Sequence, residues 1–207
     1  MMMIVGLCGF IGSGKDAAAE ALVAQGFKRL SFAQSLKDAV AAVFGWDREL
    51  LEGSTEESRA WRETIDAWWA ERLDIPCLTP RWVLQHFGLV MRDHFHGDVW
   101  TASLEKRLAE VTGDVVISDA RFPNELAMIK AAGGVIIRVA RGDEPAWYEL
   151  ALAANEGGRW SAGAQKALDA KVHSSETAWI GYKFDHVIRN DGSLEDLKSK
   201  ITSVVED

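Results

Sequence analysis

The sequence predicts an α/β fold in which helices cover both faces of a five-stranded parallel sheet. Five short apolar runs alternate along the chain with helical patterns, and such alternation is typical of parallel sheets. A glycine-rich segment directly follows the first apolar run and precedes an alanine-rich helix. The 207 residues, of which 48% are apolar, suffice for one domain with an inserted subdomain.

Each element is expected from a local pattern. Short apolar runs bounded by glycine or polar residues predict strands at 3–8, 27–32, 115–118, 133–141 and 184–190. Periodic apolar residues with start and stop signals predict helices at 14–25, 36–44, 54–73, 123–132 and 193–205. A further helix is expected to begin at Thr79, which caps it, and at Pro80 in its first turn. Residues 142–171 have weaker periodicity and predict a mobile or inserted segment.

The glycine-rich segment fits the phosphate-loop pattern G-x-x-x-x-G-K. Glycines let backbone N–H groups turn toward phosphates, the following helix directs its positive end at them, and the lysine reaches the β- and γ-phosphates. The position between a first strand and a first helix favours nucleotide binding over a tight turn with a solvated Lys15. The expected nucleotide contacts are Gly9, Ile11, Gly12, Ser13, Gly14, Lys15 and Asp16, with Arg141 at the end of the fourth strand.

Asp16 stands where the phosphate-loop pattern has serine or threonine. Magnesium prefers hard oxygen ligands and keeps several waters, so a carboxylate can hold it directly or through water. We therefore expect ATP and Mg²⁺ as the cofactors, with Asp16 and Asp119 as the metal-binding residues. The alternative for Asp16 is that it only favours the positive helix start.

The bulk composition limits the partners. A net charge of -8 disfavours a broad nucleic-acid interface but allows a small anionic ligand. No apolar run is long enough for a membrane helix, and the first residues lack the pattern of a signal peptide. The two cysteines, Cys8 and Cys77, lie far apart, which favours a reduced cytoplasm. We expect small-molecule partners, no nucleic acid and no membrane, with homodimer formation left open.

The segment Thr79 to Trp100 predicts two stripes on one helix. Leu84, Phe87, Met91 and Phe95 form an apolar stripe, and a second stripe contains Arg81, Gln85, Gly88 and Arg92. Arginine forks suit phosphate, and a glutamine amide can pair with a base edge. The second stripe therefore predicts an acceptor-binding surface, and its alternative is an ordinary solvated face.

Further polar residues follow the second and third strands. Asp119 and Arg121 come after the third strand, and ligands of open α/β sheets bind beyond the carboxyl ends of strands. Asp119 could hold magnesium or orient the acceptor, and Arg121 could bind the acceptor or the transferring phosphoryl group. Lys37, one turn into the helix after the second strand, is a candidate phosphate contact or a surface lysine.

The motifs SFAQSLKDAV, TPRWVLQHFG, MRDHFHGDVW, ISDARFPNE and HSSE resemble the deoxynucleoside monophosphate kinases of tailed bacteriophages. That family belongs to the P-loop nucleoside-monophosphate-kinase group and also ends its phosphate loop with GKD. The resemblance covers most of the chain from Ile4 to about Asn190 and is weakest between Gly142 and Lys171. If the gene belongs to a phage, the compartment is the host cytoplasm.

The resemblance implies phosphoryl transfer from ATP to deoxynucleoside 5′-monophosphates by a single P-loop kinase domain. The implied domain has a helical acceptor-binding insertion at about 46–112 and a lid-like segment at about 142–171, from which Arg159 could contribute. Expected catalytic residues are Lys15, Arg92, Asp119 and Arg121, and expected substrate contacts are Lys37, Arg81, Gln85, Arg92, Arg121, His173 and Glu176.

Two roles and two other functions stay open. His173 and Glu176 could form part of the acceptor pocket or cap and brace their helix. The loop alone is also compatible with another small-molecule kinase of the same fold, such as a phosphomevalonate kinase. A non-catalytic ATP-binding assembly module, with the helix carrying Trp61 to Trp69 as its partner surface, is the third possibility. The sequence leaves undecided which bases and which sugar the acceptor carries.

Overall fold

The computed structural model describes residues 2–157, 165, 168 and 172–206. The chain divides into two compact units. One, which we call the sheet unit, comprises Met1–Ser31 and Glu110–Asp207, and the other, the helical unit, comprises Phe32–Ala109. No helix of the described part of the chain is long and apolar enough to cross a membrane.

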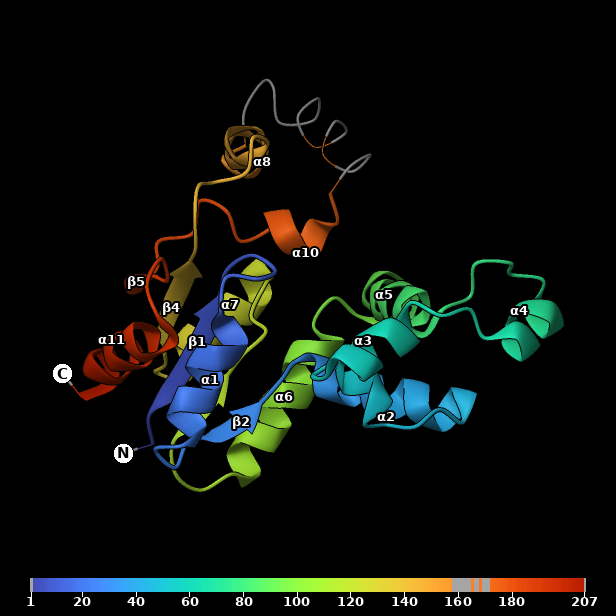
Figure 1. The fold of residues 1–207 in the computed structure, drawn as a ribbon, viewed down its shortest axis with the longest axis horizontal. Helices are drawn as coiled ribbons and strands as arrows, with labels where there is room; N and C mark the ends of the chain where they lie inside the picture. Colours follow the sequence, from blue (N-terminus) through green and yellow to red (C-terminus); the bar gives the residue numbers. More distant parts are fainter. Residues whose placement is uncertain (1, 158–164, 166–167, 169–171, 207) are drawn as a thin grey trace. The chain divides into compact units, whose positions relative to one another are not determined.

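The sheet unit contains a five-stranded, entirely parallel sheet, which confirms the predicted fold class (Figure 1). The strand order is β2-β3-β1-β4-β5, so the first strand lies at the centre. The strands are β1 (Ile4–Cys8), β2 (Lys28–Leu30), β3 (Val115–Ile117), β4 (Val135–Ala140) and β5 (His186–Arg189). They are shorter than the predicted runs because only the residues in register with a neighbour join the ladder.

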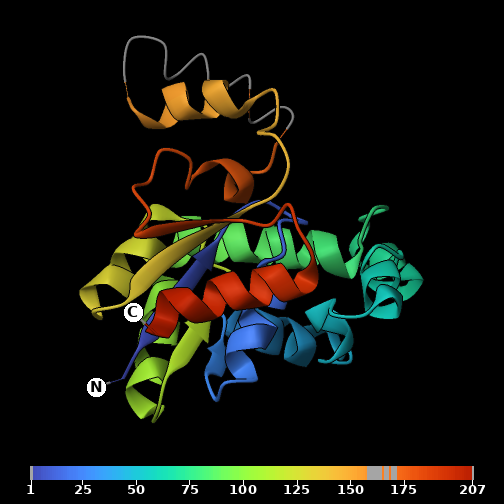
Figure 2. The ribbon, with the colours of Figure 1, turned by 60° about the vertical axis from the view of Figure 1, so that its left-hand side comes forward.

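Helices cover both faces of this sheet. On one face, Val5 and Leu7 of β1 join a buried core with α1 (Lys15–Val23) and α11 (Leu194–Glu206). Strand side chains alternate between faces, so Gly6 points the other way. A Cβ on Gly6 would lie 2.7 Å from Ile129, a residue of α7 (Pro123–Ala131). Helices α1 and α11 pack side by side, and α7 covers the opposite face (Figures 1 and 2).

The helical unit has a small core of its own. Val40, Leu51, Leu78 and Val83 are buried, and Phe44 and several tryptophans pack around them. The unit contains α2 (Ala33–Phe44), η1 (Leu50–Glu52), α3 (Glu56–Arg62), α4 (Ala67–Leu73), α5 (Pro80–Val90), η2 (Met91–Phe95) and most of α6 (Val99–Glu110). The start of α5 is as predicted, because the Thr79 hydroxyl accepts a hydrogen bond from the Trp82 N–H at 3.1 Å.

The prediction of one helix over 54–73 was wrong. The chain leaves helical geometry after Arg62 and starts α4 at Ala67. Asp66 caps α4, since its side chain accepts from the Trp69 N–H at 3.1 Å. The same carboxylate accepts from the Trp46 indole at 2.8 Å. A residue with these partners competes with helix continuation, and apolar periodicity alone could not reveal them.

The prediction of one long apolar stripe on α5 was also incorrect at its end. After Val90 the chain forms a single π-helical turn, η2, which changes the phase of the residues that follow. Phe95 is 73% exposed as a result and does not continue the stripe of Leu84 and Phe87. The segment expected at 142–171 contains α8 (Tyr148–Asn155), and α10 (Ser174–Thr177) follows it. Residues 158–164, 166–167 and 169–171 of it lie outside the described residues.

Asp185 links two strands and a helix and should make stability depend on pH. Its carboxylate accepts from the Ile136 N–H at 2.7 Å and from the Lys130 ammonium at 2.9 Å. Burial raises the pKa of Asp185, but these two hydrogen bonds outweigh burial and hold it below the ordinary value. A lowered pKa stabilises the fold above the unfolded-state pKa and loses that effect as pH falls through the folded-state pKa.

We therefore expect Asp185→Asn to lower the free energy of unfolding by about 0.5–1 kcal/mol at pH 7. The difference from the parent should shrink below about pH 4, where the aspartate of the unfolded parent takes up a proton. Guanidinium unfolding followed by circular dichroism at several pH values measures both quantities. Glu20→Gln, on an exposed position of α1, is the control. A deficit that stays constant down to pH 3 would contradict the assignment.

Candidate functional site

The phosphate loop connects β1 to α1 at the carboxyl edge of the sheet, and its shape requires glycine at both ends. Gly9 has φ +139°, and a Cβ there would lie 2.3 Å from the Val139 carbonyl oxygen. Gly14 has φ +101°, and its Cβ would lie 2.3 Å from the Asn190 amide nitrogen. Larger residues would displace the loop from the strands that support it.

Asn190, which sequence reasoning missed, fixes the loop from the end of β5. Its side-chain amide donates to the Ser13 carbonyl at 2.9 Å, and its own N–H donates to the Ala140 carbonyl at 2.7 Å. The residue is buried. The available signal was its position directly after an apolar strand, at the edge where parallel strands place their functional residues.

An aromatic cluster holds the second residue of the loop, Phe10. Its ring lies 4.6 Å from that of Trp179 and 5.4 Å from that of Trp147, measured between centroids. The Arg138 guanidinium lies 5.1 Å from the Trp179 ring centroid and pairs with Glu144. Cation–π contact and aromatic packing thus tie the loop to the segment that follows β4.

Lys15 is almost fully buried within the loop. Its ammonium donates to the carbonyl oxygens of Gly9 and Phe10, each at 2.6 Å. Burial, the largest influence, and the charge of Arg121 lower the pKa of Lys15 from 10.5 to about 8, against an opposing contribution from the Glu176 carboxylate. At pH 7 the side chain is therefore still mostly charged, and it forms a cation directly beneath the loop.

The Asp16 side chain is exposed, with 78% of its surface accessible. Its carboxylate pairs with the guanidinium of Arg29, the middle residue of β2. The Arg29 Nε also donates to the Ser118 hydroxyl at 2.9 Å. Arg29 thus joins the start of α1 to the end of β3. Sequence reasoning missed it, because a charged residue in a short edge strand carries no distinctive local pattern.

Asp119 lies at the end of β3, next to Ser118. Its Oδ2 accepts from the Ser31 hydroxyl at 2.7 Å. Among the residues described by the structure, no cluster of three or more His, Cys, Asp or Glu side chains could hold a metal ion by itself. The predicted metal ligands are Asp16, the second residue of α1, and Asp119, two residues after β3. Arg29 connects these two segments through its contacts with Asp16 and Ser118.

Arg121 and Glu176 form an ion pair that reaches the loop. The Arg121 guanidinium pairs with one Glu176 oxygen, and the other oxygen accepts from the Ile11 N–H at 3.2 Å. The backbone N–H of Arg121 donates to the Glu125 carboxylate at 2.8 Å, and this hydrogen bond helps to position Arg121. Glu125 is buried and also accepts from Phe122, which starts α7. Arg121, Glu176 and the loop are thus brought together.

The remaining predicted site residues of the sheet unit are His173, Arg141 and Arg159. His173 precedes α10, and its Nδ1 accepts from the Ser175 N–H at 3.2 Å, which makes it the cap of that helix. Arg141 is exposed directly after β4. Arg159 lies outside the described residues.

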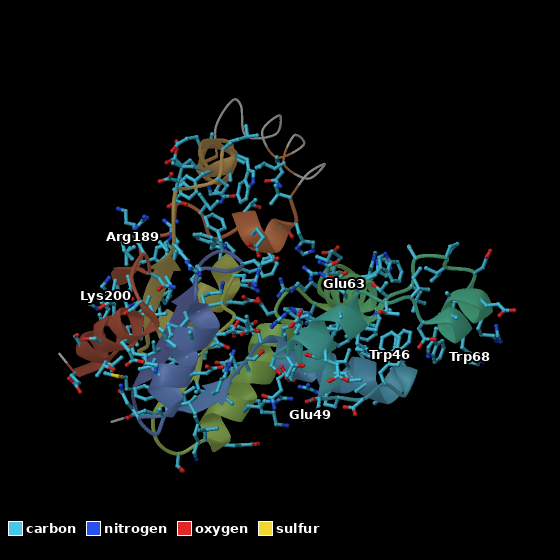
Figure 3. All side chains as sticks on the ribbon, viewed as in Figure 1. Trp46, Glu49, Glu63, Trp68, Arg189 and Lys200 are labelled. Atoms are coloured by element: carbon cyan, nitrogen blue, oxygen red, sulfur yellow. The ribbon has the colours of Figure 1, made fainter. Side chains whose placement is uncertain are left out.

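In the helical unit, the predicted acceptor residues lie on or near α5. Gln85 is exposed. Arg81 forms an ion pair with Glu63, which is labelled in Figure 3, at 2.8 Å. Arg92 lies in the π-helical turn, so it does not share the α-helical spacing of Arg81 and Gln85. Lys37 of α2 pairs with Glu52 of η1.

Two features near this stripe have protein partners. The Trp100 indole donates to the Gly88 carbonyl at 3.1 Å. Trp82 stacks on His86 with ring centroids 4.7 Å apart. A Cβ on Gly88 would also lie 3.2 Å from Leu36. The face of α5 at Gly88 therefore packs against other residues of the protein.

The comparisons with known proteins bear on the whole chain. No family model matches. The chain is 31% identical to a protein of Acanthamoeba polyphaga mimivirus described as "Putative deoxynucleotide monophosphate kinase", over 99% of this chain and 97% of that protein.

Solved structures with a similar course of the chain include two small-molecule kinases. The dephospho-CoA kinase of Campylobacter jejuni is 15% identical with a TM-score of 0.47, over 100% of this chain and 97% of that one. The shikimate kinase of Aquifex aeolicus is 14% identical with a TM-score of 0.44, over 99% and 96% of the two chains.

The identity to the mimivirus protein extends over nearly the full length of both chains. The matched region includes the strand, the glycine-rich loop and the helix that carry Lys15, and the central parallel sheet that presents them. This chain belongs to the family of P-loop small-molecule kinases that includes the mimivirus protein.

Proposed function

We propose that the protein transfers the γ-phosphoryl group of ATP to deoxynucleoside 5′-monophosphates. The observation that carries the proposal is the match over 99% of the chain to a relative described as a deoxynucleotide monophosphate kinase. The buried Lys15 and the nearby Arg121 support the phosphoryl-transfer part, because both place positive charge beside the phosphate loop. The bacteriophage resemblance supports the same acceptor class.

The attacking group in this reaction is a phosphate oxygen that is already anionic, so a general base is not essential. Catalysis then consists of aligning two anions and neutralising their charge. In the proposal, the loop N–H groups and Lys15 bind the ATP phosphates, and Arg121 neutralises the transferring group. Arg92 is proposed to share that task from the acceptor side, and Arg141 to contact ATP.

Magnesium would be held by Asp16 and Asp119 together with the nucleotide phosphates. The described donors fit this arrangement, since Mg²⁺ sites commonly use one or two carboxylates plus substrate phosphates instead of a complete protein cage. When bound, the ion supplies neutralisation of phosphate charge. Asp16 is exposed enough to exchange its Arg29 partner for such an ion.

The acceptor is assigned to the helical insertion, at about 46–112. Arg81 and Arg92 are proposed to hold the monophosphate, Gln85 to face the base, and Lys37 to add a phosphate contact. His173 and Glu176 remain candidates for a substrate contact as well. The segment at about 142–171 is proposed as a lid whose closure excludes water and suppresses ATP hydrolysis.

An acceptor panel tests the proposed function. ADP release is measured with ribo- and deoxynucleoside monophosphates and with small phosphorylated acceptors such as phosphomevalonate. The proposal expects turnover with deoxynucleoside monophosphates. Turnover with only a non-nucleotide acceptor would identify another kinase of this fold, and ATP binding without turnover would indicate an assembly module.

Replacement of Lys15 should abolish most activity. We expect Lys15→Met to fold and to reduce acceptor-dependent turnover by roughly a hundredfold or more, the scale for loss of a preorganised electrostatic contact. Lys198→Met, on the exposed side of α11, is the matched control. Near-parent turnover in folded Lys15→Met would remove the loop from the mechanism.

Asp16 should set the magnesium dependence. We expect Asp16→Ala to raise the magnesium concentration for half-maximal rate, because it removes an oxygen ligand. Asp16→Ser should restore part of the loss by supplying a hydroxyl. Metal binding measured directly by titration calorimetry with ATP present should follow the same order. If all three proteins share one magnesium dependence, Asp16 acts only at the helix start.

We expect different residues of the stripe to bind the phosphate and the base of the acceptor. Arg92→Ala should weaken all accepted monophosphates alike, because an arginine fork binds the phosphate that they share. Gln85→Ala should instead change their ranking, by roughly 1–3 kcal/mol where a polar contact to one base is lost. The measurement is kcat/KM for each acceptor, with ATP affinity as the control. A uniform loss for Gln85→Ala would leave base choice to other residues.

A further inference from the structure

We propose that Glu176 is an internal anion that occupies the phosphate loop while no nucleotide is bound, and that a bound polyphosphate displaces it. The inference rests on the proposed function only in requiring that the loop bind phosphate. It concerns the ligand-free protein and the first step of nucleotide binding, and it does not depend on the acceptor.

The contacts of Glu176 are those of a bound anion. One oxygen accepts from the Ile11 N–H at 3.2 Å, and the other pairs with the Arg121 guanidinium. Ile11 lies within the loop whose N–H groups are suited to phosphate. The Glu176 side chain is only 14% exposed, and that of Arg121 is 25% exposed, so solvent screens the pair less than it would a surface pair.

The electrostatics of Lys15 place the same carboxylate near the loop's cation. After burial and the charge of Arg121, which lower the pKa of Lys15, the Glu176 charge is the next influence and raises it. Glu176 therefore interacts with both of the cations that the proposed mechanism assigns to ATP. Its charge partly neutralises the positive charges of Lys15 and Arg121.

A polyphosphate cannot use these groups while Glu176 holds them. A backbone N–H is a single donor, so Ile11 cannot serve the carboxylate and a phosphate equally well. A carboxylate and a phosphate on the same arginine would also repel each other at short range. Binding of ATP therefore requires the Glu176 side chain to leave, and part of the binding free energy is spent on that displacement.

Departure of Glu176 also removes the hydrogen bond to Ile11 and the ion pair to Arg121, which hold α10 against these two groups. The rest of α10 stays attached to α8, because the Asn155 amide donates to the Thr177 carbonyl at 2.7 Å and to the Ile180 carbonyl at 2.9 Å. Thr177 and Trp179 are buried, and Trp179 keeps its ring contact with Phe10 of the loop. Loop occupancy is thereby coupled to the segment that carries α8 and α10, both of which belong to the sheet unit.

The test measures binding of inorganic tripolyphosphate and of ATP by calorimetry, without acceptor. Glu176→Gln keeps the size of the side chain but removes its charge, and we expect roughly tenfold tighter binding of both probes, which corresponds to about 1.4 kcal/mol. Glu176→Asp, one methylene shorter, should tighten binding by a smaller factor. Glu195→Gln removes the same charge from an exposed pair on α11 and should leave the dissociation constant unchanged.

Hydrogen exchange gives a second readout that a simple bracing role would not produce. In the parent, tripolyphosphate should protect the Ile11 amide and speed exchange in α10. In Glu176→Gln, exchange in α10 should already be fast and should not increase further. Unchanged or weaker tripolyphosphate binding in folded Glu176→Gln and Glu176→Asp would overturn the proposal. Failure of the proposed function would instead appear as absence of ADP release in the acceptor panel.

Discussion

The concentration of positive charge at the carboxyl edge of the sheet is the constraint on which the rest of the site depends. Lys15, Arg29 and Arg121 converge there with the N–H groups of the loop, in a protein whose net charge is -8. Lys15 is buried and Arg121 is partly buried, and a buried cation is unfavourable unless it has partners, whereas Arg29 is exposed. Each of the three has a partner. Carbonyl oxygens of the loop satisfy Lys15, Asp16 pairs with Arg29, and Glu176 pairs with Arg121.

This compensation explains why the loop can be rigid before a ligand arrives. Gly9 and Gly14 are confined by Val139 and Asn190, and the Phe10 ring packs against Trp147 and Trp179. A preorganised site that must bind an anion gains affinity because little ordering remains to be done. The cost of rigidity is that the cations need neutral or anionic partners in the meantime. The protein supplies these partners from the loop and the start of α1, and from α10.

The sequence predicted the parts of this arrangement that depend on local pattern. The glycine–lysine loop, the strand before it and the parallel sheet follow from spacing and periodicity, and the structure has them. The supporting residues did not follow, because their meaning lies in distant contacts. Asn190 and Ser13 are 177 positions apart, and Arg29 meets Ser118 across 89 positions. The break at Asp66 was missed for the same reason, since its partner Trp46 lies 20 positions away, between α2 and η1.

The same pairing of cations with carboxylates occurs in the helical unit, but with a different strength. Arg81 and Glu63 are 42% and 59% exposed, whereas Arg121 and Glu176 are 25% and 14% exposed. Exposed pairs contribute roughly 0–1 kcal/mol, so an anion can take Arg81 from Glu63 at little cost. A pair held near the loop costs more to separate, because removal of one partner leaves a partly buried charge. An acceptor phosphate would therefore meet weak competition at Arg81, whereas the ATP phosphates would meet strong competition at Arg121. If ATP binds at Arg121 and the acceptor at Arg81, as proposed, displacing the protein's own carboxylate costs more free energy at Arg121 than at Arg81, because the Arg121 pair is less exposed.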